Sequence, residues 1–139
     1  MTVDTETLNE RLRGNAFHED RQFHAEEVED GRVVLSMPVQ DHLTNFSGNL
    51  HGGVLATLVD TASALAIRVT YEDPWAPGLA TTDLTVSYVR PASGEVRADA
   101  EIVRVGGSLA VTEVEVTGVA PDGERKTVAI GGTTYRVFT

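Results

Sequence analysis

The chain of 139 residues contains no cysteine and a single lysine, Lys126. The absence of cysteine excludes thiol catalysis, cysteine metal sites and disulfides together, and says little about the cellular compartment. No apolar run approaches the roughly 18 residues of a membrane span, and no charged-then-apolar leader opens the chain. We therefore expect a cytoplasmic protein with no membrane partner. A chain of this length fits one domain with its own core.

The charge balance is strongly acidic. The 11 basic residues stand against 21 acidic ones, which gives a net charge of −10 at pH 7. Nucleic-acid-binding proteins carry a basic face, so we expect no nucleic-acid partner. A surface poor in lysine suits a high-salt cytoplasm, where salt screens self-repulsion, but an ordinary acidic mesophile fits the same composition.

The most informative segment is His51-Gly52-Gly53, with Asp60 further along the same apolar run. Periodicity predicts a helix from Gly52 to about residue 71, because Pro74 disfavours helical geometry before it. The first N–H groups of a helix lack partners and its peptide dipoles sum there, so this start can bind the oxygen of a polarised carbonyl. A carboxylate on the same helix can act as base or nucleophile, and the pair points to carbonyl chemistry.

The expected helix is apolar over most of its surface. One broad stripe consists of Val54, Leu55, Leu58, Val59, Ala62, Leu65, Ala66 and Val69. The opposite side carries Gly53, Ala56, Thr57, Asp60, Ser63, Ala64 and Ile67. The only charges on the helix are Asp60 and Arg68, so we expect it to be buried nearly all round, with a second element close to its small residues.

Strand patterns surround this helix. Residues 23–29 and 32–39 predict a hairpin, and four further strands are expected at 79–90, 96–105, 109–119 and 127–138. Short turns join these four strands, which predicts an antiparallel meander. Residues 1–16 are expected to form an N-terminal arm or short helix, and residues 17–139 a single domain. The predicted class is α+β, with an antiparallel β-sheet wrapped around one long central α-helix.

The chain resembles the hotdog-fold thioesterases of the 4-hydroxybenzoyl-CoA thioesterase superfamily, in particular the phenylacetyl-CoA thioesterase-like branch. The resemblance covers about residues 17–138. It rests on Asn45-x-x-Gly48-x-x-His51-Gly52-Gly53 with Asp60, on Thr81-x-Asp83 leading into Tyr88-x-Arg90-Pro91-Ala92, and on the Val105-Gly-Gly-Ser108 hairpin. It implies hydrolysis of acyl-CoA thioesters to free acid and CoA, in a homodimer or a dimer of dimers (homotetramer) with sites shared between subunits.

The resemblance also implies catalytic roles for single residues. The N–H of Gly52 is expected to bind the oxyanion, Asp60 to activate water or attack directly, and the hydroxyl of Thr81 to assist. Asn45 and His51 are expected to position or polarise the thioester. Taken singly, a histidine at position 51 is more often a helix cap or a loop residue than a catalytic one. The other histidines and carboxylates show no metal-ligand spacing, so we expect no metal and no cofactor.

Substrate-binding residues are expected around this centre. Gly53 lies at the helix start, and Arg90 is the first choice for a cation at the pocket mouth, where a protein of charge −10 must compensate an anionic CoA nucleotide. Gly107 and Ser108 are expected to offer backbone contacts to the pantetheine arm. The acyl group stays open among aromatic, medium-chain and hydroxylated classes.

Spacing along the helix supports a shared site independently of the family. Gly52 and Asp60 are eight residues apart, about 12 Å of helix rise. One thioester carbon cannot lie within about 3.5 Å of both groups. Either the carboxylate acts elsewhere, or a second chain brings its own Asp60 to this Gly52, as in a homodimer with two equivalent sites.

Two other functions remain alternatives. A hotdog enoyl-CoA hydratase also acts on acyl-CoA, and a non-catalytic acyl-CoA-binding hotdog protein can use the same pocket. Asp60 favours a catalyst over a binding module, because an apolar binding pocket gains nothing from an unpaired carboxylate.

Overall fold

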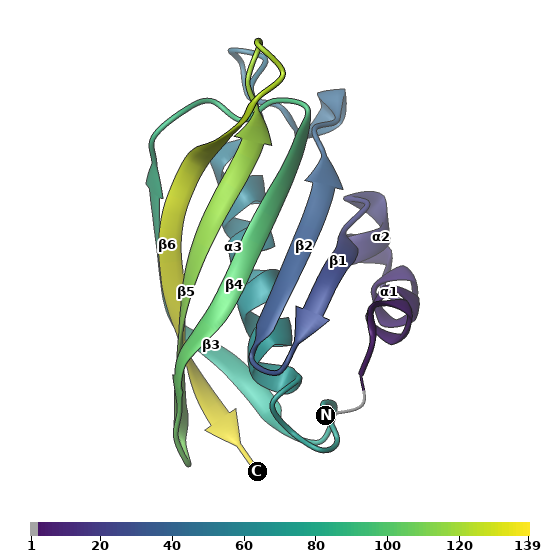
Figure 1. Ribbon diagram of the computed structural model, residues 1–139, viewed down its shortest axis with the longest axis vertical. Helices are drawn as coiled ribbons and strands as arrows, with labels where there is room; N and C mark the ends of the chain where they lie inside the picture. The colour runs from purple at the N-terminus through teal and green to yellow at the C-terminus, as the bar shows by residue number, and fades with distance from the viewer. Residues whose placement is uncertain (1–2) are drawn as a thin grey trace.

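The computed structural model describes residues 3–139 and places one long helix against a six-stranded antiparallel sheet (Figure 1). The helical elements are α1 (Thr5–Arg13), α2 (Ala16–Asp20), the 3-10 turn η1 (Asp41–Leu43) and α3 (Gly52–Arg68). The strands are β1 (His24–Glu29), β2 (Arg32–Pro38), β3 (Gly78–Tyr88), β4 (Glu95–Val105), β5 (Leu109–Val119) and β6 (Arg125–Phe138). The predicted α+β class, with an antiparallel sheet around one long helix, is confirmed.

The strand order is β1-β2-β4-β5-β6-β3, which differs from the predicted meander. β4, β5 and β6 do pair consecutively, but β3 pairs with β6 and forms the far edge of the sheet. Residues 89–94 carry the chain across one end of the sheet from β3 to β4 (Figure 1). The prediction that β3 would pair with β4 was wrong. With β3 at the far edge, strands that precede and follow α3 in the chain cover it from both sides, which buries more of its apolar surface.

The apolar stripe of α3 packs into the main core, as predicted. Leu58, Val59 and Ala62 have no exposed surface. Two residues of the opposite side are also fully buried: Ser63 accepts a hydrogen bond from the Thr112 hydroxyl at 2.9 Å, and Ile67 packs in a smaller core cluster with residues of β5 and β6. The rest of that side is partly or fully exposed: Gly53, Ala56, Thr57, Asp60 and Ala64. Within one chain, therefore, α3 is not buried nearly all round.

α3 ends at Arg68, about three residues earlier than predicted. The N–H of Val69 still bonds to the Leu65 carbonyl at 3.0 Å. The Thr70 hydroxyl then donates to the Ile67 carbonyl at 2.7 Å, an alternative to continued helical bonding that threonine readily makes. The Thr70 side chain therefore helps to end the helix, in addition to Pro74.

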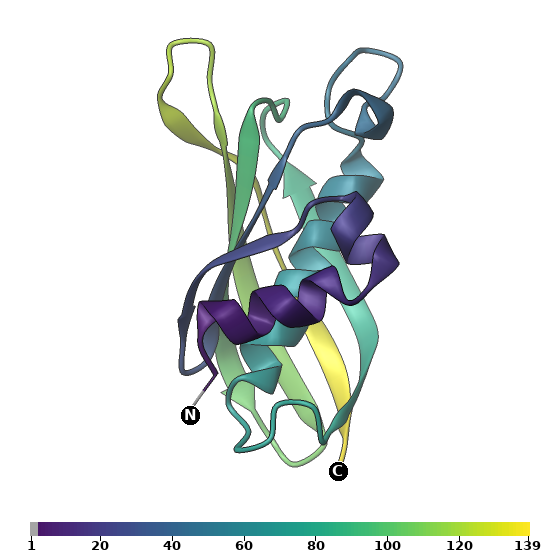
Figure 2. The same ribbon diagram turned by 90° about the vertical axis from the view of Figure 1, so that its right-hand side faces the viewer.

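The two edges of the sheet differ. At the β1 edge, α1 packs Leu8 and Leu12 into the main core, and it lies in front of the sheet in Figure 2. The Asn9 side chain accepts from the Ala25 N–H at 2.7 Å and donates to the Ala25 carbonyl at 3.1 Å, so it satisfies both backbone groups of Ala25 in β1. At the other edge, β3 has a neighbouring strand on one side only among residues 3–139. The boundary at residues 16 and 17 stays a prediction, and residues 1 and 2 lie outside the described part.

The helices of residues 3–139 are all too short or too polar to cross a bilayer.

Candidate active site

The N-terminus of α3 presents one unoccupied N–H group. His51 caps the helix, with its Nδ1 accepting from the Gly53 N–H at 2.9 Å. The His51 carbonyl accepts from the N–H groups of Val54 and Leu55. No acceptor within residues 3–139 bonds to the Gly52 N–H. Because a helix start carries partial positive charge, the Gly52 N–H is available to a developing oxyanion.

The cap also defines how His51 presents its ring. A ring nitrogen that accepts a hydrogen bond carries no proton, so a His51 with Nδ1 as acceptor has its proton on Nε2. The Nε2–H is then a donor at the helix start. His51 can therefore cap the helix through Nδ1 and polarise a substrate through Nε2–H at the same time.

Tyr88, at the end of β3, contacts the same helix start. Its hydroxyl donates to the Gly52 carbonyl at 2.5 Å. A Cβ on residue 52 would lie 3.3 Å from the Tyr88 Cζ, so glycine leaves the space in which the phenol reaches the backbone. Burial raises the pKa of Tyr88, which keeps its hydroxyl a donor at neutral pH. The sequence placed Tyr88 in a motif but carried no signal of this contact.

A cleft of about 430 Å³ adjoins this helix start, and its lining includes Asn45, Gly52, Tyr88 and Arg90. The structure therefore brings together three residues predicted for the site from separate parts of the chain: Asn45 from the loop before α3, Gly52 from the helix and Arg90 from the segment after β3.

Asn45 and Arg90 are each anchored by one part of their side chain. The Asn45 Oδ1 accepts from the N–H groups of Ser47 at 3.0 Å and Asn49 at 3.2 Å, which holds the loop. Its Nδ2 has no partner within residues 3–139 and remains a donor. Arg90 donates from Nη1 to the Thr127 carbonyl at 2.6 Å, and this bond holds the guanidinium at the cleft.

Asp60 lies on the open side of α3, and two hydroxyl groups hold one of its oxygens. Thr81 donates to Oδ1 at 2.9 Å. Tyr135 donates to the same Oδ1 through a short hydrogen bond and also lies 2.9 Å from the Asp60 carbonyl oxygen. Within the described chain Oδ2 has no partner, so that oxygen is free to take a proton or attack a carbonyl. The structure thus brings Thr81, one of the residues predicted for the site, into contact with Asp60.

Tyr135 is a site residue that sequence reasoning missed. It lies directly opposite Thr81 in the β3–β6 register, a neighbour relationship that no local pattern predicts. It is buried, with 4% of its surface exposed. Burial, and then the hydrogen bond to Asp60, raise the pKa of Tyr135, so the phenol stays protonated and can donate.

Asp60 lines a second cleft, of about 390 Å³, between α1, α3 and the loop after α3. The Gly52 and Asp60 groups thus belong to different clefts of one chain, about 12 Å apart along the helix. In one chain, the Gly52 N–H and the Asp60 carboxylate do not meet.

Gly107 and Ser108 lie away from the Gly52 cleft of the same chain. Their hairpin joins β4 and β5, and the Ser108 carbonyl accepts from the Val137 N–H at 2.8 Å. This is the end of the sheet where Gly78 begins β3, whereas Tyr88, which contacts Gly52, ends it.

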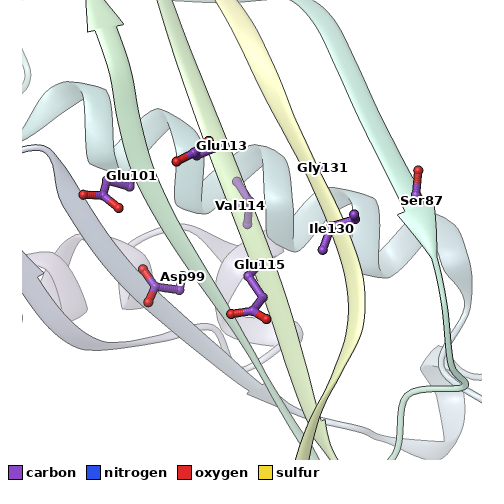
Figure 3. A pocket seen from close by; sticks show the side chains of 8 residues that line it. All are labelled: Ser87, Asp99, Glu101, Glu113, Val114, Glu115, Ile130 and Gly131. Carbon is purple, nitrogen blue, oxygen red and sulfur yellow. The ribbon is translucent and has the colours of Figure 1, made fainter.

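A further hollow, of about 510 Å³, lies on the outer face of the sheet, with α3 behind the strands (Figure 3). Four carboxylates line it: Asp99, Glu101, Glu113 and Glu115. They would repel an anionic substrate. No group of His, Asp and Glu within residues 3–139 is arranged to bind a metal ion. We therefore assign no site to this surface.

Comparisons with known proteins identify a family for this chain. The family model described as the thioesterase superfamily matches residues 47–120. The chain is 45% identical over 118 residues to a protein of Halobacterium salinarum that carries the name of an esterase, covering 81% of this chain and 78% of that protein. It is 39% identical over 92 residues to human acyl-coenzyme A thioesterase 13, covering 65% of this chain and 64% of that protein.

Solved structures match over nearly the whole chain. Zebrafish thioesterase superfamily member 2 has a TM-score of 0.82 at 28% identity, covering 97% of this chain and 99% of that one. A Haemophilus influenzae thioesterase has a TM-score of 0.86 at 24% identity, covering 100% and 93%, and this likeness concerns the fold alone. The sequence relatives, the family match and the shared architecture confirm the predicted resemblance: the chain belongs to the thioesterase superfamily, as a hotdog-fold thioesterase.

Proposed function

We propose that this protein hydrolyses acyl-CoA thioesters to the free acid and CoA, at a site that two chains share. The substrate class rests on the relatives named acyl-coenzyme A thioesterase 13. The observation that carries the chemistry is the carboxylate of Asp60, which Thr81 and Tyr135 hold by one oxygen while the other is free.

In the proposed reaction the Gly52 N–H donates to the thioester oxygen as negative charge develops there. As a general base, Asp60 takes a proton from water while the water oxygen bonds to the carbonyl carbon. The C–S bond then breaks, and the CoA sulfur receives the proton from Asp60. As a nucleophile, Asp60 instead bonds to the carbonyl carbon, and the C–S bond breaks to release CoA as a thiolate and leave an anhydride. Water then hydrolyses the anhydride to the free acid and the Asp60 carboxylate, and the proton that this step releases goes to the thiolate. Asn45 and His51 supply further donors beside Gly52.

The sheet edges support sharing between two chains. α1 covers the β1 edge, whereas β3 presents 11 residues with a neighbour on one side only in the described chain. An open edge of this length is a template for another strand. We take the second strand to be β3 of another copy, related by a two-fold axis, so that both chains use the same surface.

Antiparallel pairing of two β3 strands would also unite the separated groups. The Gly78 end of one strand would lie beside the Tyr88 end of the other, since antiparallel strands run in opposite directions. Thr81 lies near the first end and contacts Asp60; Tyr88 lies at the second end and contacts Gly52. Each Gly52 would then face the other chain's carboxylate, and the protein would have two equivalent sites.

The same pairing would place the remaining predicted residues. The Gly107–Ser108 hairpin of one chain lies at its Gly78 end, so in the pair it would approach the Gly52 cleft of the other chain, where Arg90 supplies positive charge for the CoA nucleotide. The Gly53 N–H donates to His51 and is not available to the substrate. Gly53 would therefore contribute to substrate binding by leaving space at the helix start, where it has no side chain. Association of two dimers into a tetramer and a cytoplasmic location stay predictions.

The test is release of free thiol from a panel of acyl-CoA substrates by the wild-type protein and by Asp60→Asn. Asparagine keeps the shape of the side chain and accepts the same two hydrogen bonds, so we expect the rate to fall at least about 100-fold with little change in melting temperature. Asp30→Asn, in the exposed turn between β1 and β2, is the matched control and should retain the wild-type rate.

The other outcomes separate the alternatives. A near wild-type rate for Asp60→Asn would reject the catalytic role of this carboxylate. Tight binding of acyl-CoA without thiol release from any substrate would favour a non-catalytic acyl-CoA-binding protein. Addition of water to enoyl-CoA without thiol release would favour a hydratase.

A further inference from the structure

The cleft that contains Asp60 extends along α3 toward two arginines. At one end, Asp60 and Tyr135 line the cleft. Two turns further along the helix it is lined by Arg68, together with Arg11 of α1 and Trp75 of the loop after α3. Asp60 and Arg68 are separated by about 12 Å of helix rise. Both side chains line the same cleft.

The two guanidinium groups lie against one aromatic ring. The Cζ of Arg11 is 4.3 Å and the Cζ of Arg68 is 5.8 Å from the centroid of Trp75. Arg68 donates from Nη1 to the carbonyls of Pro74 at 3.0 Å and Pro77 at 2.9 Å, which holds the loop and orients the group. The Arg11 guanidinium makes no hydrogen bond within residues 3–139, and its contact there is with the Trp75 ring.

Neither arginine forms an ion pair within residues 3–139, although the chain has 21 acidic residues against 11 basic ones. Burial, and then the neighbouring charge of Arg11, lower the pKa of Arg68. Two like charges beside one ring destabilise each other, and an anion between them would relieve that repulsion.

The wall between the carboxylate and the arginines suits a hydrocarbon chain. Ala64 and Leu65 line the cleft on α3, and Leu12 lines it on α1, beside the polar side chains of Asn15, His18 and Thr61. An acyl group whose thioester carbon reacts at Asp60 would run along this wall and end at the guanidinium pair. Arginine binds a carboxylate with two parallel hydrogen bonds, which a methyl end cannot accept.

We propose that the acyl group of the substrate occupies this cleft and ends in a carboxylate bound by Arg11 and Arg68 over Trp75, so that the preferred substrates are CoA thioesters of dicarboxylic acids. The inference rests on the proposed function, since it takes the reaction to occur at Asp60. The phosphates of CoA are the other source of an anion. They lie on the far side of the sulfur from the acyl group, and the Arg90 cleft at Gly52 is the cationic site proposed for them.

A pair of substrates of equal length tests the inference. Hydrolysis of adipyl-CoA and hexanoyl-CoA, which differ only in the terminal carboxylate, would be compared for the wild type, Arg11→Gln and Arg13→Gln. We expect wild-type kcat/KM to favour adipyl-CoA by about 10-fold or more, because charge-assisted hydrogen bonds are the stronger ones. Arg11→Gln should abolish most of that preference. Arg13→Gln removes the same charge from the same helix outside the cleft and should keep it.

Binding of stable thioethers keeps this test separate from catalysis. The Kd values of S-(5-carboxypentyl)-CoA and S-hexyl-CoA would be measured by calorimetry with the same variants. The inference is supported if the wild type binds the carboxylated analogue more tightly than S-hexyl-CoA and Arg11→Gln abolishes this difference in affinity. This result would stand even if no thioester is hydrolysed and the proposed function fails. Equal affinity of the two analogues for the wild type overturns it. An equal loss of affinity for both analogues on Arg11→Gln also overturns it, because the arginine would then bind the phosphates of CoA.

Discussion

The hydroxyl of Tyr88 donates a 2.5 Å hydrogen bond to the carbonyl oxygen of Gly52 and so joins the edge strand β3 to the start of α3. The peptide unit that carries this carbonyl also carries the Gly53 N–H, which bonds to the Nδ1 of His51. One peptide is therefore held at both ends. The preceding peptide carries the Gly52 N–H, which is free within the described chain and is kept in a defined direction by its neighbour.

Tyr88→Phe tests this arrangement. The ring remains, but the bond to the Gly52 carbonyl is lost, and a hydrogen bond of this kind contributes about 0.5–1.5 kcal/mol. We expect kcat for thioester hydrolysis to fall about 3- to 10-fold with little change in KM, because the Gly52 N–H, the proposed oxyanion donor, loses orientation and no substrate contact is removed. Tyr71→Phe, whose hydroxyl makes no hydrogen bond in the described chain, is the control. An unchanged kcat for Tyr88→Phe would contradict the role of this bond.

Mixed dimers test the shared site. Gly52→Val places a side chain where a Cβ alone would lie 3.3 Å from Tyr88, so we expect it to block the helix start. Asp60→Asn removes the carboxylate. Each variant should be inactive alone, and a fully exchanged equal mixture should recover about a quarter of wild-type activity, since half the dimers are mixed and each has one intact site of two.

The mixing result depends on subunit exchange, which mass spectrometry of differently tagged chains would verify. Each variant mixed with itself is the control. If mixed dimers form and no activity returns, Gly52 and Asp60 do not act across the two chains.

Tyr135→Phe tests the positioning of the carboxylate. The substitution keeps the buried ring and removes one of the two hydroxyl donors to the Asp60 Oδ1. Hydrogen bonds to charged groups contribute about 1.5–3 kcal/mol, so we expect kcat to fall about 10-fold or more while KM changes little. The melting temperature would be measured alongside. A parallel loss of stability sufficient to unfold the protein at the assay temperature would contradict a positioning role, as would wild-type kcat.

The outer face of the sheet predicts a dependence of stability on salt. Glu101 and Glu113 lie directly opposite each other on β4 and β5, and neither has an ion pair within residues 3–139. Like charges in this position are destabilising, so Glu113→Gln should raise the free energy of unfolding by about 0.2–1 kcal/mol at low salt. Screening at about 1 M salt should remove most of this gain.

Denaturant unfolding at two salt concentrations measures this difference. Glu72→Gln, in the exposed loop after α3, is the control and should show no gain. A gain for Glu113→Gln of the same size at both salt concentrations would show that its origin is not charge repulsion.

The sequence by itself determined the local parts of this protein. Apolar periodicity and turn residues placed the long helix start at Gly52 and all six strands to within a few residues, because these signals depend on neighbours along the chain. The helix start and the carboxylate of Asp60 were likewise readable, since both belong to one continuous segment. The order of the strands could not be read from the sequence, and the predicted pairing of β3 with β4 was wrong.

Only the tertiary structure decided which side chains complete the site. Tyr135 reaches Asp60 because β3 pairs with β6, and Tyr88 reaches Gly52 because the edge strand returns to the start of α3. Ser63 and Ile67 are buried for the same reason, since β5 and β6 cover that part of the helix. Pairing of distant strands depends on how much apolar surface the whole sheet can bury against the helix, a long-range balance that no local pattern of residues contains.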